Sequence, residues 1–194
     1  PALWPVLGAV LQRQRQALDL DAEPALIAQA MAALPVPPRE GLRLCGGIDG
    51  FEIAVRVILG QQVTVAAART LTRRLVDALG TPVATPFDGI DRLFPTAATV
   101  AAADPEQIGT LGIVRQRVRA LQALAAAVHE GTIELHRGAP LLPTMEALRA
   151  LPGIGEWTVQ LIAMRALAWP DAYPSTDIGL LNALGTRDLK AVDA

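Results

Sequence analysis

The segment LPGIGEWTVQ, residues 151–160, joins two stretches of helical periodicity by a turn rich in glycine and proline. Pro152 disfavours helical conformation at the residue before it. Gly153 and Gly155 lack side chains and can adopt positive φ, so the backbone can reverse direction within a few residues. The sequence therefore predicts two short helices that meet in a tight hairpin.

A hairpin of this kind has a chemical consequence at the start of its second helix. The first N–H groups of a helix have no partner within it, and the positive end of the helix dipole lies at the same point. A phosphate oxygen is a suitable ligand for such a site. An ordinary turn between two helices is the alternative, and an isolated PGxG pattern favours that interpretation.

Helical periodicity dominates the rest of the chain. Aromatic residues make up 4% of the 194 residues, and most turn signals lie between stretches of helical period, so we expect a mainly helical protein with few strands. The clearest stripe predicts a helix over residues 114–129 that buries one face, with Gly131 just beyond its end. The stripe consists of Val114, Val118, Leu121, Ala125 and Val128.

Other helices are predicted from caps and breaks. Residues 1–34 contain two short helices separated by Asp19-Leu20-Asp21, residues 51–60 form a buried helix, and a further helix is capped by Gly80. Asp104 followed by Pro105 has the order of an N-cap and a first helical residue. Thr144 is the expected N-cap of the helix that precedes the hairpin.

The charge balance excludes proteins that coat nucleic acid through bulk charge. The formal net charge is -2, so any contact with DNA has to come from a local site. Arg115, Arg117 and Arg119 could supply one, although charged residues on an outer helix face are usually just solvated. The single cysteine, Cys45, rules out an internal disulfide and fits a reducing compartment. With no long apolar run and no signal-peptide pattern, we expect a cytoplasmic protein without a membrane segment.

Two residues near the hairpin make its pattern more specific. Asp177 lies twenty residues after Trp157, at the start of a last predicted helix. From its local sequence, Ser-Thr-Asp, the ordinary role of Asp177 is a helix N-cap. Trp157 is as compatible with core packing as with a binding surface. The combination of hairpin, tryptophan and aspartate is nevertheless more informative than any one of them.

In these features the chain resembles the helix-hairpin-helix DNA glycosylases, and among them the DNA-3-methyladenine glycosylase II family. The resemblance rests on LPGIGEWT and STDIGLLNAL within residues 148–184, on ILGQQVTVAAARTL at 58–71 and on residues 103–135. It extends over most of residues 1–184. It implies an all-α helix-hairpin-helix fold with two helical lobes and the active site in the cleft between them.

The resemblance also implies how the chain is divided. Residues 1–45 would supply N-terminal helices and a connector that pack with the C-terminal part, and residues 46–140 would form the central helical lobe. Residues 141–194 would hold the hairpin and the aspartate. The family's last aromatic helix has no counterpart after residue 194, so we expect this third unit to be truncated at its C-terminus. The family's N-terminal α/β region is also without a counterpart, which should not affect the site.

The implied activity is base excision repair. It would hydrolyse the N-glycosidic bond of alkylated bases, 3-methyladenine above all, after the base has been flipped out of the duplex. Asp177 matches the family's catalytic aspartate. Methylation of a ring nitrogen makes the base a cationic leaving group, so one carboxylate can stabilise the charge that grows on the sugar and position the water. Further candidate bases are 7-methylguanine, hypoxanthine and ethenoadenine.

Other residues receive roles from the same resemblance. Gln62, in the loop Gly60-Gln61-Gln62-Val63, matches the residue that wedges into the base stack, although a polar break between two buried helices is nearly as good an interpretation. The carbonyls of Leu151 and Ile154 would hold a Na⁺ or K⁺ ion, and no cofactor is expected to be required. The remaining assignments are DNA contacts by Gly153, Gly155 and Thr158 and a base pocket formed by Trp157, Leu161 and Ile178.

Trp157 bears on the type of reaction. Relatives that also cleave the DNA backbone carry a lysine at this hairpin position to form a Schiff base, whereas the single lysine of this sequence is Lys190. We therefore expect a monofunctional glycosylase without lyase activity, in which the Trp157 ring faces the flipped cationic base. The tyrosine of the family pattern, one turn after Trp157, is Leu161 here, which loosens the expected pocket.

Two other interpretations stay open. The chain could be a non-catalytic helix-hairpin-helix module that binds DNA, or a fragment of a larger alkylation-response protein. It could also be a helical protein-interaction domain in which LPGIG is a mere turn. The partner expected on the leading interpretation is damaged double-stranded DNA, bound by a monomer.

Overall fold

The computed structural model describes residues 3–32 and 39–185. Within these ranges the chain forms ten α-helices, one 3-10 helix and one pair of very short strands, which confirms the predicted all-α class. The α-helices are α1 (Leu7–Ala17), α2 (Pro24–Met31), α3 (Gly50–Gly60), α4 (Val65–Leu79), α5 (Ala97–Ala102), α6 (Pro105–Thr110), α7 (Arg115–His129), α8 (Leu141–Arg149), α9 (Glu156–Arg165) and α10 (Ile178–Leu184). The 3-10 helix is η1 (Trp4–Val6), and the strands are β1 (Thr81–Pro82) and β2 (Arg92–Leu93).

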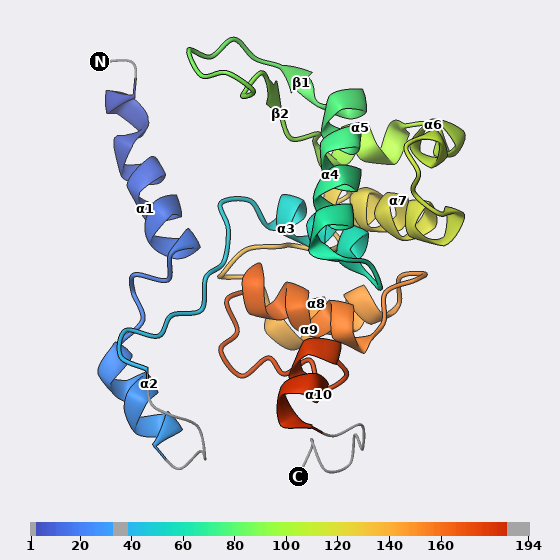
Figure 1. Ribbon diagram of the computed structural model, residues 1–194. Helices are drawn as coiled ribbons and strands as arrows, with labels where there is room; N and C mark the ends of the chain where they lie inside the picture. The colour runs from blue at the N-terminus through green and yellow to red at the C-terminus, as the bar shows by residue number, and fades with distance from the viewer. Residues whose placement is uncertain (1–2, 33–38, 186–194) are drawn as a thin grey trace.

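The helices lie in three groups (Figure 1). One group contains α3 to α7, a second contains α8, α9 and α10, and the third, α1 with α2, lies to one side. Helix α3 joins the first two groups because it packs against α4 and α7 and also against α9. The boundaries predicted near residues 45 and 140 both fall in loops, and as domain limits they stay predictions. No helix in the described part of the chain has the length and apolar character needed to cross a bilayer.

Helix α3 is buried, as its apolar sequence predicts. Ala54, Val55, Ile58 and Leu59 are completely inaccessible to solvent. Asp49 begins the helix, since its carboxylate accepts the N–H of Glu52 at 2.8 Å. The helix that ends at the Gln61 loop is therefore fixed by the hydrophobic core along most of its length.

Helix α7 also confirms its predicted stripe, with one correction at the start. Val118, Leu121 and Ala125 are buried, and Gly131 has the positive φ of 74° expected just beyond a helix end. Val114, however, is the extended N-cap and is 58% exposed. The first residue of the stripe therefore lies just outside the helix and faces solvent.

The two predicted N-caps had different outcomes. Asp104 caps α6 by accepting the N–H of Glu106 at 2.9 Å, with Pro105 as the first helical residue, as predicted. The N-cap predicted at Thr144 is wrong, because α8 begins three residues earlier, at Leu141, and Thr144 lies buried inside it. The cause is Pro143, which sits in the first turn of α8, where a proline is tolerated, and does not mark a loop.

The strands pair antiparallel, with Thr81 opposite Leu93, and are as few as expected. Gly80 is the C-cap of α4, as predicted, and its backbone there is extended, with a φ of −72°. A Cβ at Gly80 would lie 2.5 Å from the carbonyl oxygens of both Val76 and Leu93. A glycine is needed here because the backbones approach closely.

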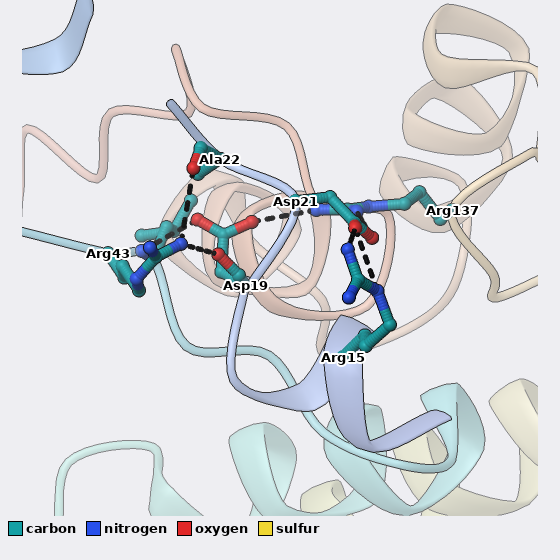
Figure 2. Close-up of polar contacts among 7 residues, drawn as sticks. Arg15, Asp19, Asp21, Ala22, Arg43 and Arg137 are labelled. Atoms are coloured by element: carbon teal, nitrogen blue, oxygen red, sulfur yellow. Dashed lines mark hydrogen bonds and ion pairs between the residues drawn. The ribbon is translucent and has the colours of Figure 1, made fainter. Parts of the chain in front are cut away.

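The N-terminal helices are fastened to the rest of the chain by Asp19 (Figure 2). Its carboxylate accepts the N–H of Leu44 at 3.0 Å and a guanidinium N–H of Arg137 at 2.8 Å. Its carbonyl accepts Arg43 at 2.5 Å. Asp19 itself is 7% exposed, whereas α1 and α2 contribute no buried residue. A polar cluster therefore takes the place of hydrophobic packing in this region.

Candidate active site

The predicted hairpin forms between α8 and α9. Gly153 has a φ of 75°, and an added Cβ would lie 3.3 Å from Cβ of Ala120 on α7, so both conformation and space favour glycine. Gly155 differs from the expectation, because its φ of −95° and ψ of 175° are extended and open space surrounds its Cα. Among the described side chains none caps the N-terminus of α9. Its first N–H groups are thus left for another partner.

An ion pair closes the base of this hairpin. The guanidinium of Arg149, at the end of α8, binds both carboxylate oxygens of Glu156, at 2.7 Å and 3.0 Å. The hydrogen bond from Arg149 lowers the pKa of Glu156, and the same bond raises the pKa of Arg149. Glu156 also accepts the amide of Gln160 at 2.7 Å. The bidentate pairing fixes the geometry in which α8 enters the turn and α9 leaves it.

Asp177 has both of its carboxylate oxygens engaged. Oδ1 accepts the N–H groups of Gly179 at 2.8 Å and Leu180 at 3.2 Å, which makes Asp177 the N-cap of α10, as its local sequence predicts. Oδ2 accepts the indole N–H of Trp157 at 2.7 Å. The Trp157 hydrogen bond, with help from the two backbone N–H groups, lowers the pKa of the Asp177 carboxyl against the opposing effect of partial burial. The group is a fixed, ionised carboxylate at neutral pH.

Trp157 lies in the first turn of α9, directly after the hairpin. Its ring is half-buried against the hydrophobic core, and its N–H points to Asp177. Sequence reasoning brought the two residues together in one site but did not foresee the bond between them. Because the loop between α9 and α10 has no regular period, no signal in the sequence indicates which of its residues meets the indole.

The two other predicted pocket residues lie close to this pair in the chain. Leu161 is one turn after Trp157 on the same face of α9 and packs partly against the core. Ile178 follows Asp177 as the first residue of α10 and is 63% exposed. A large exposed aliphatic side chain beside an ionised carboxylate is compatible with a binding surface. The base-pocket role of the three residues stays a prediction.

The predicted wedge residue stands in the turn between α3 and α4. Gln62 is exposed and has a φ of 53°, which side-chain-bearing residues rarely adopt. The neighbouring Gln61, which received no role from the sequence, donates its side-chain amide to the Gly153 carbonyl at 3.0 Å and to Thr158 Oγ1 at 2.9 Å. The structure thus joins the Gln62 loop to the hairpin across more than 90 residues of sequence.

The predicted DNA contacts of the hairpin differ in accessibility. Gly153 and Gly155 are exposed, so their backbone can be reached from solvent. The Thr158 side chain is 2% exposed and accepts the Gln61 amide, so its hydroxyl supports the loop and does not face solvent. Contacts between DNA and these three residues stay predictions. For Thr158, such a contact would involve the backbone and not the buried side chain.

The hairpin carbonyls fit the chemistry of a monovalent cation. The carbonyl of Leu151 accepts the N–H of Ile154 at 3.3 Å, and the second lone pair of this oxygen can take a further partner. Neutral carbonyl oxygens are suitable ligands for hard cations. In the described part of the chain no group of three or more His, Cys, Asp or Glu side chains could hold a metal ion. A cation site made of carbonyls stays a prediction.

Comparison with known proteins identifies the family. The family model for the HhH-GPD superfamily base excision DNA repair proteins matches residues 55–189. The "Probable bifunctional transcriptional activator/DNA repair enzyme AlkA" of Mycobacterium tuberculosis is 39% identical over 173 residues, which are 87% of this chain and 34% of that protein. DNA-3-methyladenine glycosylase 2 of Escherichia coli is 37% identical over 175 residues, 90% of this chain and 61% of the relative. The chain therefore spans about a third to three fifths of the length of these relatives.

Solved structures show the same fold at lower identity. The 3-methyladenine DNA-glycosylase of Archaeoglobus fulgidus has a TM-score of 0.74 at 20% identity, covering 96% of this chain and 67% of that one. The 8-oxoguanine glycosylase/lyase of Clostridium acetobutylicum has a TM-score of 0.75 at 17% identity, covering 92% and 65%. The predicted resemblance to DNA-3-methyladenine glycosylases and to the helix-hairpin-helix fold is confirmed by these matches. The chain belongs to the HhH-GPD superfamily of base excision DNA repair proteins.

Proposed function

We propose that this protein is a monofunctional DNA glycosylase that hydrolyses the N-glycosidic bond of alkylated bases, with 3-methyladenine as its principal substrate. The observation that carries the proposal is the Asp177 carboxylate, which three hydrogen bonds hold beside the hairpin. The names of the M. tuberculosis and E. coli relatives support the substrate class. The expected partner is damaged double-stranded DNA, bound by a monomer in the bacterial cytoplasm or nucleoid.

The chemistry follows from the charge of the damaged base. The bond between the sugar C1′ and the ring nitrogen breaks, and its electron pair neutralises the cationic base as it leaves. Positive charge grows on the sugar, where the Asp177 carboxylate stabilises it. The oxygen of a water molecule then bonds to C1′ and loses its proton to Asp177 or to solvent.

The lowered pKa of Asp177 indicates which of these tasks matters more. A carboxylate with a depressed pKa stays charged over a wide pH range but is a weak proton acceptor. The proposal therefore gives Asp177 mainly an electrostatic role, and the positioning of water a secondary one. Trp157 acts through Asp177 as a positioning residue, in addition to the predicted contact of its ring with the base.

The type of reaction follows from the side chain at position 157. An indole cannot form a Schiff base with the sugar, whereas a lysine amine can. The fold does not decide this point, because glycosylases and a glycosylase/lyase share it. We expect DNA strands to remain intact after base release.

Each of the remaining predicted residues would make a different contact with DNA. Gln62 would fill the gap left by the flipped base, and Trp157, Leu161 and Ile178 would contact that base. Backbone N–H groups at the start of α9 would bind phosphate, which suits a chain with a net charge of -2. A cation held by the carbonyls of Leu151 and Ile154 would add positive charge at the hairpin.

Base release by the chain tests the proposal. Methylated duplex DNA is incubated with the protein, free bases are separated, and the strands are examined before any alkali treatment. Released 3-methyladenine with intact abasic strands is the expected result. Binding of abasic duplex without any base release would instead support a non-catalytic helix-hairpin-helix module.

A further inference from the structure

The side chain of Gln61 uses both of its amide hydrogens. Gln61 follows the last residue of α3, and its Nε2 donates to the Gly153 carbonyl at 3.0 Å and to Thr158 Oγ1 at 2.9 Å. One acceptor belongs to the turn of the hairpin and the other to the first turns of α9. An amide nitrogen has two hydrogens, so its donor capacity is fully used.

Each partner of this side chain is itself fixed in place. Thr158 is buried, and Gly153 lies against Ala120 of α7 with a φ of 75°. Helices α3 and α9 pack directly against each other. The acceptors are therefore at fixed positions and define one place for the Gln61 amide.

The backbone of Gln61 is held from a second side. Its carbonyl accepts the guanidinium of Arg117, which reaches it from the first turn of α7. The Arg117 side chain is half-buried, in contrast to Arg115 and Arg119, which are exposed. Gln61 thus connects the α3–α4 loop with α7, the hairpin turn and α9.

The residue after Gln61 has an unusual backbone conformation. Gln62 has the left-handed φ of 53° that non-glycine residues disfavour, and its side chain is exposed. A residue keeps such a conformation where its surroundings determine it. With Gln61 fixed at both its backbone and its side chain, the chain leaves α3 in one direction and presents Gln62 to solvent.

We propose that Gln61 is a positioning residue that couples the Gln62 loop to the helix-hairpin-helix, so that the two contact DNA as one preorganised unit. This inference rests on the proposed function, because it assigns Gln62 the wedge role. Without the Gln61 contacts the loop would have to order itself during base flipping, which costs affinity for the flipped state. Binding of the hairpin to phosphate would be affected much less.

Two near-isosteric variants test the coupling. Gln61→Glu replaces the double donor by a carboxylate, which cannot donate to the Gly153 carbonyl, and Gln61→Met removes the donor without adding charge. Gln107→Glu, at an exposed position on α6, is the control for the change of charge. Thermal melting establishes that each variant is folded. If Gln61→Glu does not fold, Gln61→Met and Thr158→Val, which removes one acceptor, give the same information.

Two readouts separate positioning from a general structural effect. The first is the single-turnover rate of base release with the enzyme in excess. The second is the fluorescence of 2-aminopurine beside an abasic-site analogue, which reports unstacking on wedge insertion. We expect both Gln61 variants to lose roughly tenfold in release and most of the fluorescence gain. Their affinity for undamaged duplex should stay within about twofold, and Thr158→Val should show a smaller loss in the same direction.

The possible outcomes distinguish a failure of this inference from a failure of the proposed function. If the parent releases base and both Gln61 variants match it in release and fluorescence, the coupling is wrong and the glycosylase proposal stands. If the parent releases no base, the glycosylase proposal fails. The 2-aminopurine signal on abasic DNA still decides the coupling in that case, because an unchanged signal in both variants overturns it.

Discussion

The two oxygens of the Asp177 carboxylate have different hydrogen-bond partners, so this one residue both caps α10 and contacts Trp157. Oδ1 is occupied by two backbone N–H groups of α10, and Oδ2 by the indole of Trp157. The helix therefore fixes the position of the carboxylate, and the indole fixes the orientation of its second oxygen. Cap and candidate catalytic group are the same residue, so the two interpretations of its sequence do not compete.

Trp157→Phe tests the contribution of the indole. The phenyl ring still covers a bound base, but the N–H donor to Asp177 is lost. Because this bond is the largest cause of the lowered pKa, the pKa of Asp177 should rise, and base release at neutral pH should fall roughly tenfold. The measurement is the pH profile of single-turnover release, in which the acid limb of the variant should lie at higher pH than that of the parent.

The control for this variant is Trp4→Phe, in the exposed η1 segment. It should leave the profile unchanged. A Trp157→Phe profile that coincides with the parent would show that the ring alone matters.

The same lowered pKa means that ionised Asp177 stabilises the fold above about pH 3.9, and that this contribution is lost as pH falls through the lower pKa of the folded state.

Among the elements, the hairpin contains two glycines that meet different structural requirements. Gly153 combines a left-handed φ with close approach to α7, whereas Gly155 is extended and surrounded by open space. The sequence predicts the hairpin from both glycines but cannot distinguish them, because the distinction depends on α7, which lies more than twenty residues away in sequence. The Arg149–Glu156 pair adds a clamp that is partly exposed and worth at most about 1 kcal/mol.

Gly153→Ala and Gly155→Ala form a matched pair that tests this difference. The first introduces a Cβ 3.3 Å from Ala120 at a φ of 75°, and the free energy of unfolding should fall by about 1–2 kcal/mol. The second should change the free energy of unfolding by less than about 0.5 kcal/mol. Urea denaturation measures both, and equal losses would contradict the described turn.

Sequence reasoning was accurate where a helix carries its own signals. The buried stripe of α7 and the cap at Asp104 follow from local periodicity and cap chemistry. It was wrong at Thr144, because Pro143 is compatible both with a loop and with a first helical turn. Local sequence cannot decide between these two where the packing of the helix determines its start.

At the scale of the whole molecule, the site depends on contacts between distant segments. The Trp157–Asp177 bond and the Gln61–Gly153 bond both cross irregular loops, whose conformation has no periodic signal in the sequence. Asp177, Trp157 and Gln62 could therefore be named as candidates from the sequence, while the bonds that join these segments could not be predicted. The role of Gln61 was missed for the same reason.

The N-terminal helices are attached mainly by the Asp19 cluster, and Asp19→Asn tests that attachment. Asparagine also tolerates the φ of 51° at this position, but it removes the charge that pairs with Arg137. We expect a local cost of about 1.5 kcal/mol, which accelerates exchange of the Leu44 and Gly46 amide hydrogens roughly tenfold.

The exposed Asp21→Asn is the control for this experiment, since Asp21 pairs with Arg15 and Arg137 at the surface. It should change the exchange of both amides by less than about twofold. Amides of α3 in the core should be unaffected by either variant. Unchanged protection of Leu44 and Gly46 in Asp19→Asn would show that other contacts hold the N-terminal segment.

We propose two roles for the Asp177 carboxylate, which are to cap α10 and to carry the reaction. The most direct measurement compares Asp177→Asn with the parent for release of 3-methyladenine from methylated duplex and for affinity to abasic duplex. Asparagine caps a helix as well as aspartate does, so the fold should be preserved. Asp171→Asn, an exposed aspartate in the same loop, is the matched control. We expect Asp177→Asn to release base at least about a hundredfold more slowly than the parent, with affinity within a few-fold of it. Release at the parent's rate would show that Asp177 only caps the helix.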